Sequence, residues 1–331
     1  MERKKHWYLK FLSLFLIIGC SSDNGEGEKE IIPIKANFTI NSSEILVNES
    51  VSFSDSSSGN PTSWTWTFNG GIPSTSNQQN PVVTYNNAGT YSVKLVASNI
   101  ETSDEIVKEG IITVNHDLTN GLIIQVLLDG NAQDTSSNNY PSEIIGTVNP
   151  TTNRNGDANK AMEFNENDGF IAFYSIDELE IEYSSTITVS VWINPNGNQN
   201  EWDTILNQYF GGPPPSAVGR FYLGLNPSNQ RVRWNVFENH LESSNPIPIN
   251  EWTHILVSYN ERNAKMYING NLDGELNLGP ETYLLGSGAP FRIGKQSLTP
   301  STTSGFSGII DDINIFNRIL DEEEILLLFN Q

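Results

Sequence analysis

The sequence is poor in cysteine and in positive charge. It has one cysteine, Cys20, in 331 residues, so it cannot form a disulfide within the chain. Lysine and arginine number 18 against 39 aspartates and glutamates, which gives a formal net charge of -21 at pH 7. Nucleic-acid binding needs positive charge to displace counterions, so we expect no nucleic-acid partner. The same field disfavours polyanionic glycans, so a polysaccharide partner is expected to be neutral rather than anionic.

Several catalytic patterns are also missing. The four histidines make no pair with the spacing of metal ligands, and neither G-x-S-x-G nor a phosphate-binding glycine loop occurs. One of them, His254, stands within an alternating strand-like segment, where we expect a structural role. The sequence therefore has no motif for a histidine-bound zinc, for a serine nucleophile in G-x-S-x-G, or for a nucleotide phosphate in a glycine-rich loop.

An apolar run near the N-terminus is too short to span a bilayer. It extends from Phe11 to Ile18, whereas a transmembrane helix needs about 20 apolar residues. Three basic residues at positions 3–5 precede it, which is the layout of a secretory signal peptide over residues 1–19. The segment ends Ile-Ile-Gly-Cys, which resembles the bacterial lipobox and implies that Cys20 is acylated.

The next segment, residues 20–35, is polar and acidic, which predicts a flexible tether. An acidic stretch at this position resembles the surface-export signal of lipoproteins in Bacteroidetes-type bacteria. This resemblance implies a protein that is lipid-anchored in the outer membrane and faces the cell exterior. Its contact with the membrane would be through the lipid anchor alone.

Residues 36–115 contain short alternating segments that predict β-strands. One of them, Ser63–Phe68, places Trp64, Trp66 and Phe68 on one face and is followed by an Asn-Gly-Gly turn. The block resembles the PKD domain, an immunoglobulin-like β-sandwich, although the carboxylate usual in this turn is absent. We expect both tryptophans to be core residues rather than a sugar platform. The domain would then serve as a spacer.

Residues 116–331 predict a second β-domain. Segments 252–259 and 264–270 alternate apolar and polar residues around a short polar connection, which predicts a β-hairpin. In the closing strand Gly308–Phe316, strict alternation places Asp311 on an otherwise apolar face. A charge that faces a core must be paired, hydrogen-bonded or bound to a metal.

A helix is expected after the closing strand, because Asp321 and Glu324 have the pattern of a capping box. The motifs EWTHILVSYN, AKMYINGNLDG and GFSGIIDDINIFNRILDEEEI resemble the laminin-G-like, concanavalin A-like lectin/glucanase family. The predicted fold class is thus all-β, with an immunoglobulin-like PKD sandwich followed by a concanavalin A-like jelly-roll sandwich.

A structural calcium ion is the cofactor that this resemblance implies. In the family, the aspartate of the closing strand often binds calcium together with oxygens near the first strand. The corresponding candidates are Asp129, Asp134 and Asp311. Calcium favours six to eight hard oxygen ligands, which a loop of aspartate, asparagine and carbonyl groups can supply. The alternative is that Asp311 accepts backbone hydrogen bonds and that the loop is only a turn.

A carbohydrate-binding surface needs aromatic rings that stack on sugars and polar groups that bind hydroxyls. Trp202 and Tyr209 lie in a loop-rich section, and Trp234 lies in the strand Arg-Val-Arg-Trp-Asn; these three are the predicted glycan-binding residues. For Trp234 the alternative is a position in the core, because Trp234 shares a strand face with valines. Trp192 and Trp252 are expected in the core.

Catalysis is a further alternative. Glu178, Glu180 and Glu182 share one strand face and loosely resemble the nucleophile and acid motif of laminarinase-type glycosidases. A retaining glycosidase needs two carboxyl groups about 5–5.5 Å apart, one with a raised pKa. The central residue is glutamate where that family has aspartate, so a solvated strand face is the preferred interpretation.

These observations predict a cell-surface lipoprotein that captures polysaccharide without cleaving it. Such a protein would serve polysaccharide utilisation beside neighbouring glycan-uptake proteins at the surface. Two alternatives stay open: a glycoside hydrolase of laminarinase type, and an adhesin that binds a protein partner.

Overall fold

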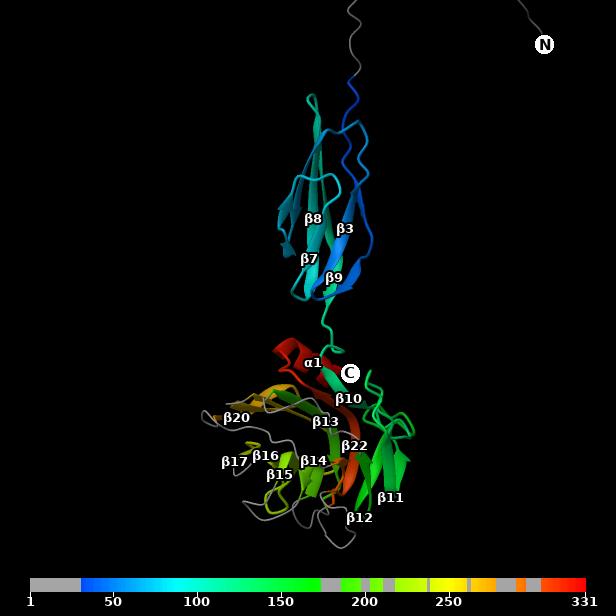
Figure 1. The fold of residues 1–331 in the computed structure, drawn as a ribbon, viewed down its shortest axis with the longest axis vertical. Helices are drawn as coiled ribbons and strands as arrows, with labels where there is room; N and C mark the ends of the chain where they lie inside the picture. The colour runs from blue at the N-terminus through cyan, green and yellow to red at the C-terminus, as the bar shows by residue number, and fades with distance from the viewer. Residues whose placement is uncertain are drawn as a thin grey trace, which may run out of the picture. The chain divides into compact units, whose positions relative to one another are not determined.

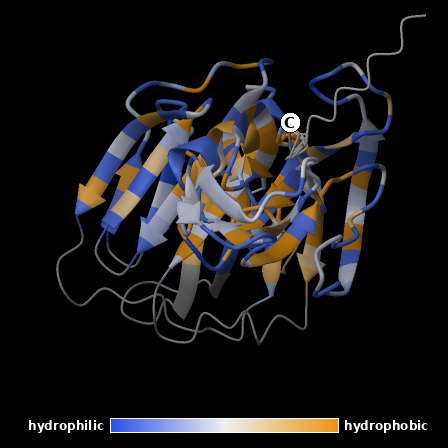
Figure 2. Cartoon of the chain, turned by 90° about the horizontal axis from the view of Figure 1, so that it is seen from above, coloured by the Kyte–Doolittle hydropathy of each residue, from blue (hydrophilic) through white to orange (hydrophobic). Residues whose placement is uncertain are grey.

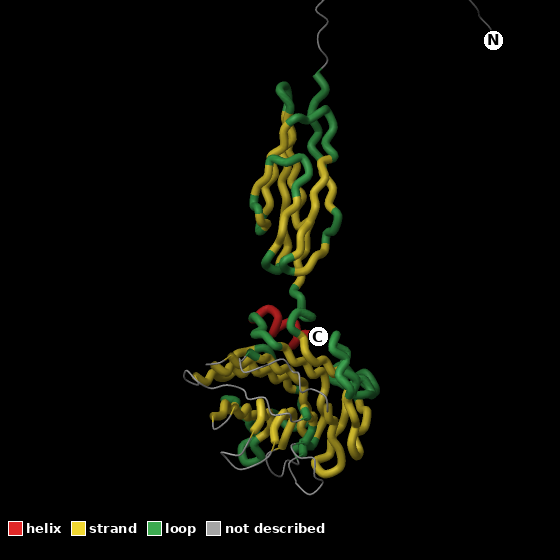
Figure 3. Tube along the Cα trace, viewed as in Figure 1, coloured by secondary structure: helices red, strands yellow, loops and turns green. Residues whose placement is uncertain are grey.

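The computed structural model describes residues 31–173, 186–197, 203–210, 218–236, 239–260, 263–277, 290–295 and 305–331. Nearly all of the described secondary structure is β-strand, with one short helix near the C-terminus (Figures 1 and 3). The chain divides into two compact units, Met1–Asn115 and His116–Gln331. Among the described residues, no helix has the length and apolar character needed to cross a membrane.

The first unit is a sandwich of two sheets. One sheet has the order β1 (Phe38–Ile40), β3 (Glu49–Asp55), β7 (Val82–Tyr85) and β5 (Gly71–Ile72). The other has the order β2 (Glu44–Leu46), β9 (Ser103–Asn115), β8 (Gly89–Ser98), β4 (Ser63–Phe68) and β6 (Thr75–Ser76).

Aromatic side chains fill the core of this first sandwich. Trp66 packs edge-on against Phe38, with ring centroids 5.2 Å apart, and stacks on Phe68. Its indole nitrogen donates a hydrogen bond to the backbone oxygen of Gln78. Trp66 is buried as predicted, and Trp64, near the start of β4, is half-buried and packs against both this core and a small neighbouring cluster. The tryptophan strand therefore serves mainly to build the core.

The second unit is a jelly-roll sandwich made from one long folded sheet. Its corner is β12 (Ala161–Phe173), which pairs with β22 through its first residues and with β21 through its last. On one side of this corner lies what we call the back sheet: β22 (Gly308–Phe316) with β10 (Leu122–Val126) at its edge, β13 (Ile187–Pro195), β18 (Thr253–Asn260), β19 (Asn263–Ile268) and β20 (Asn271–Asn277).

On the other side of the corner lies what we call the front sheet: β21 (Phe291–Ile293), β14 (Asp203–Phe210), β15 (Val218–Leu225), β16 (Val232–Val236) and β17 (Asn239–Glu242). The remaining strand, β11 (Ser142–Thr151), pairs with β12. Hydrophobic and hydrophilic residues alternate along many of these strands (Figure 2). The inward-facing residues of both sheets form a single hydrophobic core.

The helix α1 (Glu322–Asn330) covers part of the outer surface of the back sheet. Its buried apolar residues, Ile325 and Leu328, join a cluster with Leu256, Tyr267 and Phe316 of that sheet. The predicted capping box is confirmed: Asp321 accepts a hydrogen bond from the backbone nitrogen of Glu324, and the Glu324 carboxylate accepts one from the backbone of Asp321. The predicted hairpin is also confirmed, as the antiparallel pair of β18 and β19.

The closing strand departs from strict alternation, and this corrects the expected position of Asp311. The pairing of β22 with β13 shifts register between Ser190 and Trp192, and Asp312 has a left-handed φ of 41°. Because this bulge adds a residue to β22, the core residues are Ile310, Ile313 and Ile315. Asp311 pairs with Trp192 and lies on the outer face of the back sheet, away from the core.

Candidate functional site

A row of mostly polar residues crosses the front sheet. In the strand pairings, Arg292 stands opposite Asn207, Asn207 opposite Tyr222, Tyr222 opposite Asn235, and Asn235 opposite His240. Directly paired residues of neighbouring strands share one face of a sheet. These five residues, from β21, β14, β15, β16 and β17, therefore form one continuous line, which we call the polar row.

The polar row faces away from the hydrophobic core. On each strand, the residues beside the row position belong to the core cluster: Phe291, Ile293, Leu206, Phe221, Leu223, Trp234 and Leu241. Side chains alternate between the two faces of a strand. The row therefore lies on the outer face of the front sheet, which points away from the back sheet.

Burial decreases along the polar row. Asn207 is 0% exposed and Arg292 is 2% exposed, while Asn235 is half-buried and His240 is exposed. The buried end is held in place by hydrogen bonds: Asn207 donates from Nδ2 to the backbone oxygen of Lys295 at 2.8 Å, and its Oδ1 accepts from Arg292 Nη1 at 3.5 Å. The row thus joins a fixed, buried polar end to an exposed end.

A second row supports the exposed end. Arg233 pairs with Gly224 on one side and with Glu242 on the other, and lies on the same face as Asn235. Its Nε donates to Asn235 Oδ1 at 2.7 Å, and its Nη1 lies 3.8 Å from Glu242 Oε1. Arg233 therefore fixes the amide of Asn235, and its charge is balanced by Glu242.

The centre of the row depends on close contact between Tyr222 and Gly224. A Cβ atom on Gly224 would lie 2.2 Å from the Tyr222 hydroxyl oxygen and 2.6 Å from the backbone oxygen of Asp203. Burial raises the pKa of Tyr222 well above its usual range. The hydroxyl is therefore neutral, and a neutral phenol can both donate and accept hydrogen bonds.

Of the three predicted glycan-binding aromatics, only Trp234 has a side chain that the structure describes. Trp202 lies outside the described residues, and Tyr209 is in β14 with a side chain that the structure does not describe. Trp234 is 1% exposed and stacks on Phe221, with ring centroids 4.9 Å apart, in the core. The expectation that Trp234 binds sugar is therefore corrected in favour of its core alternative, because alternation in β16 places it beside Val232.

Among the described residues, the three predicted calcium ligands do not belong to a group of acids whose ligand atoms lie within 4.8 Å of one another. Asp129 is paired with Lys160 at 2.6 Å, and Asp311 with Arg154 at 2.9 Å. Asp134 accepts hydrogen bonds from three backbone nitrogens, those of Gln125, Ser136 and Tyr140. Each carboxylate already has a protein partner, so the described residues do not fit a calcium site built from these three. The turn alternative holds for Asp134.

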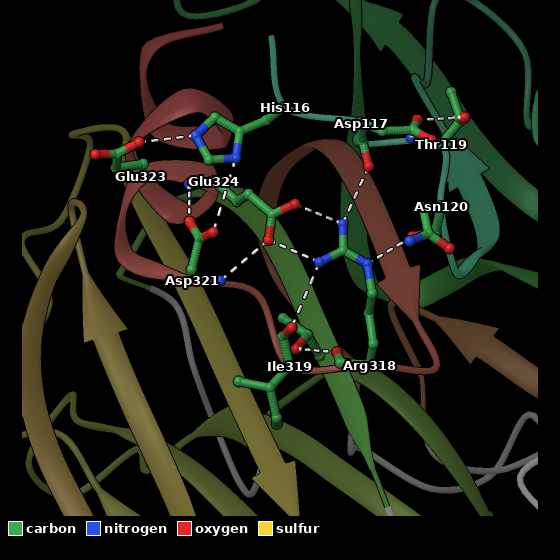
Figure 4. A network of polar contacts seen from close by, with 10 residues as sticks. His116, Asp117, Thr119, Asn120, Arg318, Ile319, Asp321, Glu323 and Glu324 are labelled. Carbon is green, nitrogen blue, oxygen red and sulfur yellow. Dashed lines mark hydrogen bonds and ion pairs between the residues drawn. The ribbon is translucent and has the colours of Figure 1, made fainter. Parts of the chain in front are cut away.

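Only one group of three potential metal ligands comes together among the described residues, and its members serve the fold. His116, Asp321 and Glu324 have ligand atoms within 4.8 Å of one another (Figure 4). Asp321 caps α1, while both oxygens of Glu324 bind Arg318, at 2.7 and 2.6 Å. Arg318 also donates to the backbone oxygens of Asp117 and Asn120. The network ties the start of the second unit to its closing helix.

The described residues give catalysis little support. Glu178, Glu180 and Glu182 lie outside them. His254 is buried, with Nε2 2.8 Å from Ser190 Oγ. Burial, with the charge of Arg154 as a smaller cause, lowers the pKa of His254 to about 3. A neutral, buried imidazole on the outer side of the back sheet agrees with the structural role expected for it.

Comparison with known proteins agrees with this architecture. Residues 37–105 match the PKD domain, and residues 165–326 match the Laminin_G_3 family of the concanavalin A-like lectin/glucanases superfamily. No curated protein matches the chain.

Solved structures show the same fold at low identity. The binding domain of Paraclostridial Mosquitocidal Protein 1 is 22% identical, with a TM-score of 0.51 over 65% of this chain and 53% of that chain. The botulinum neurotoxin serotype D/C binding domain is 16% identical, with a TM-score of 0.50 over the same shares. The chain thus spans about half the length of these two domains.

A third solved structure is domain 4 of the GH43 extracellular arabinanase AbnA from Geobacillus stearothermophilus, in complex with arabinotriose. It is 21% identical, with a TM-score of 0.46 over 62% of this chain and 97% of that chain. From the two family matches and the two sandwiches described above, the chain contains a PKD domain, matched over residues 37–105, followed by a domain of the concanavalin A-like lectin/glucanases superfamily, matched over residues 165–326.

Proposed function

We propose that the second unit binds a polysaccharide on the outer face of its front sheet and does not cleave it. The polar row carries this proposal, because it lines up an arginine, two amides, a phenol and an imidazole across five adjacent strands. Sugar hydroxyls both donate and accept hydrogen bonds, and the accessible end of the row, Asn235 and His240, matches them in both roles. The superfamily, which includes lectins, supports the same reading.

The row also favours binding over hydrolysis. Glycoside hydrolysis by the usual route needs two carboxyl groups that flank the scissile bond. None of the five residues of the polar row is a carboxylate. Glu242, in the supporting row, is paired with Arg233. The proposed role is therefore capture, with a neutral polysaccharide as the favoured partner because the chain carries a net charge of -21.

The remaining parts of the proposal concern location. Acylation of Cys20, which precedes the described residues, would anchor the protein in the outer membrane with its domains outside the cell. Residues 20–35 would act as a tether and the PKD domain as a spacer. Captured polysaccharide would then be held close to neighbouring surface proteins that take up glycans.

Affinity electrophoresis tests this function. Residues 31–331 are run through gels that contain neutral or acidic polysaccharides, and reducing ends are assayed after incubation with the same glycans. Retardation by a neutral polysaccharide without new reducing ends is the expected result. New reducing ends would favour a hydrolase, and the absence of both across the panel would favour an adhesin with a protein partner.

A further inference from the structure

Two consecutive acids of the closing strand share one arginine. Asp311 Oδ2 lies 2.9 Å and Asp312 Oδ2 2.7 Å from the same atom, Arg154 Nη1. The side chain of Asp311 is 1% exposed and that of Arg154 is 11% exposed, so this contact is largely shielded from water. Neighbouring residues of a regular strand point to opposite faces. The bulge at Asp312 is what turns both carboxylates toward one partner.

Arg154 is held in this position from two further directions. Its guanidinium carbon lies 4.7 Å from the ring centroid of Trp192, which is a cation–π contact. It stands in the turn between β11 and β12, where the side chain of Asn153 accepts hydrogen bonds from the backbone nitrogens of Asn155 and Asp157. The guanidinium is therefore part of a built site, fixed by its loop, by the ring and by two acids.

The same turn also forms a second, more exposed ion pair. Lys160 Nζ binds Asp129 Oδ2 at 2.6 Å. Asp129 and Asp311 are two of the three acids that the sequence predicts as ligands of a structural calcium ion. In the structure, the turn between β11 and β12 supplies a positive side chain to each of them.

We infer that Arg154 takes the place of a structural divalent cation at the closing strand, so that the second unit folds and stays folded without calcium. A buried carboxylate needs a counter-charge or a metal to offset its loss of hydration. A guanidinium presents several donors in a planar fork and stays charged at all working pH values. This inference is independent of the glycan proposal, because it concerns the opposite, back sheet.

Thermal unfolding of residues 31–331 in millimolar calcium and in chelator is the first test. A bound ion that prefers the folded state raises the unfolding temperature, so the inference predicts a difference below about 1 °C. Calorimetric titration of the same protein with calcium should show no binding. The inference would be overturned if calcium raised the unfolding temperature by several degrees, or if the titration showed saturable binding of calcium at one site per chain.

Variants then test the arginine itself. Arg154→Met leaves buried Asp311 without its cation and should lower the unfolding temperature by about 10 °C. The matched control Lys160→Met loses an exposed pair and should change it by less than about 2 °C. The double variant Arg154→Met/Asp311→Asn removes both partners and should recover much of the loss. If Arg154→Met unfolds at the wild-type temperature, Arg154 does not replace a cation.

Discussion

The hydroxyl group of Tyr222 lies over Gly224, two residues further along β15, at a distance that leaves no room for a Cβ atom. Gly224 does not have a left-handed backbone, so the need for glycine here is steric. The pair sets the position of the ring at the middle of the polar row. A small side chain added at Gly224 should therefore displace the Tyr222 ring and alter the proposed binding face.

Gly224→Ala should move the Tyr222 side chain and destabilise the second unit by about 1–3 kcal/mol, which is typical of overpacking. It should also weaken glycan retardation. Gly274→Ala in β20 is the matched control, because its added Cβ meets the flexible end of Leu241 at 3.2 Å. Urea unfolding and affinity electrophoresis measure both effects. Equal losses in the two variants would contradict this role of Gly224.

Trp234→Ala should cost about 3–5 kcal/mol of unfolding free energy, since it removes a fully buried indole from the core. Trp234→Phe should cost less, because a ring still stacks on Phe221. In folded protein, glycan affinity of the Phe variant should match the wild type. A loss of binding with unchanged stability would restore Trp234 as a ligand-binding residue.

Arg318→Met should lower the unfolding free energy by about 2 kcal/mol, because the poorly exposed Glu324 carboxylate loses a partner that binds both its oxygens. His116→Gln is the control: its partner Glu323 is exposed, so the change should stay below about 1 kcal/mol. Urea unfolding monitored by tryptophan fluorescence gives both values. Similar costs for the two variants would show that the network is not centred on Arg318.

The buried His254 predicts a dependence of stability on pH. Its pKa is lowered to about 3 in the folded protein, against an ordinary value of 6.5. The unfolded chain therefore binds an extra proton between these values. Stability should fall by about 1 kcal/mol for each pH unit as pH decreases from 6.5 toward 3. In His254→Gln this part of the slope should vanish, as urea unfolding at several pH values would show.

The local features of the fold could be predicted from sequence because they depend on near neighbours. The hairpin of β18 and β19 and the capping box of Asp321 and Glu324 each use residues a few positions apart. Alternation failed at Asp311, since a bulge interrupts the period of two without a distinct sequence signal. For Trp234 the valine two residues before it indicated a core position, but the prediction assigned Trp234 to the sugar-binding surface, and the structure corrects this.

The polar row could be predicted only in part. Alternation in Arg-Val-Arg-Trp-Asn indicates that Arg233 and Asn235 face away from the core. It cannot indicate which residues stand beside them, because Asn207 and Arg292 are 85 positions apart and meet only through strand register. The sequence-based prediction selected aromatic residues, because aromatic rings stack on sugars. The face that the structure describes includes two asparagines and two arginines that this criterion does not select.

The most direct test of the glycan-binding proposal is the affinity of a variant altered at the exposed end of the polar row. Asn235→Ala/His240→Ala is compared with wild type and with Glu275→Gln, an exposed change on the back sheet, against a retained polysaccharide. Loss of two hydrogen bonds should weaken binding about tenfold or more, with the control unchanged. Unaltered retardation of the double variant would place glycan binding elsewhere and contradict the account.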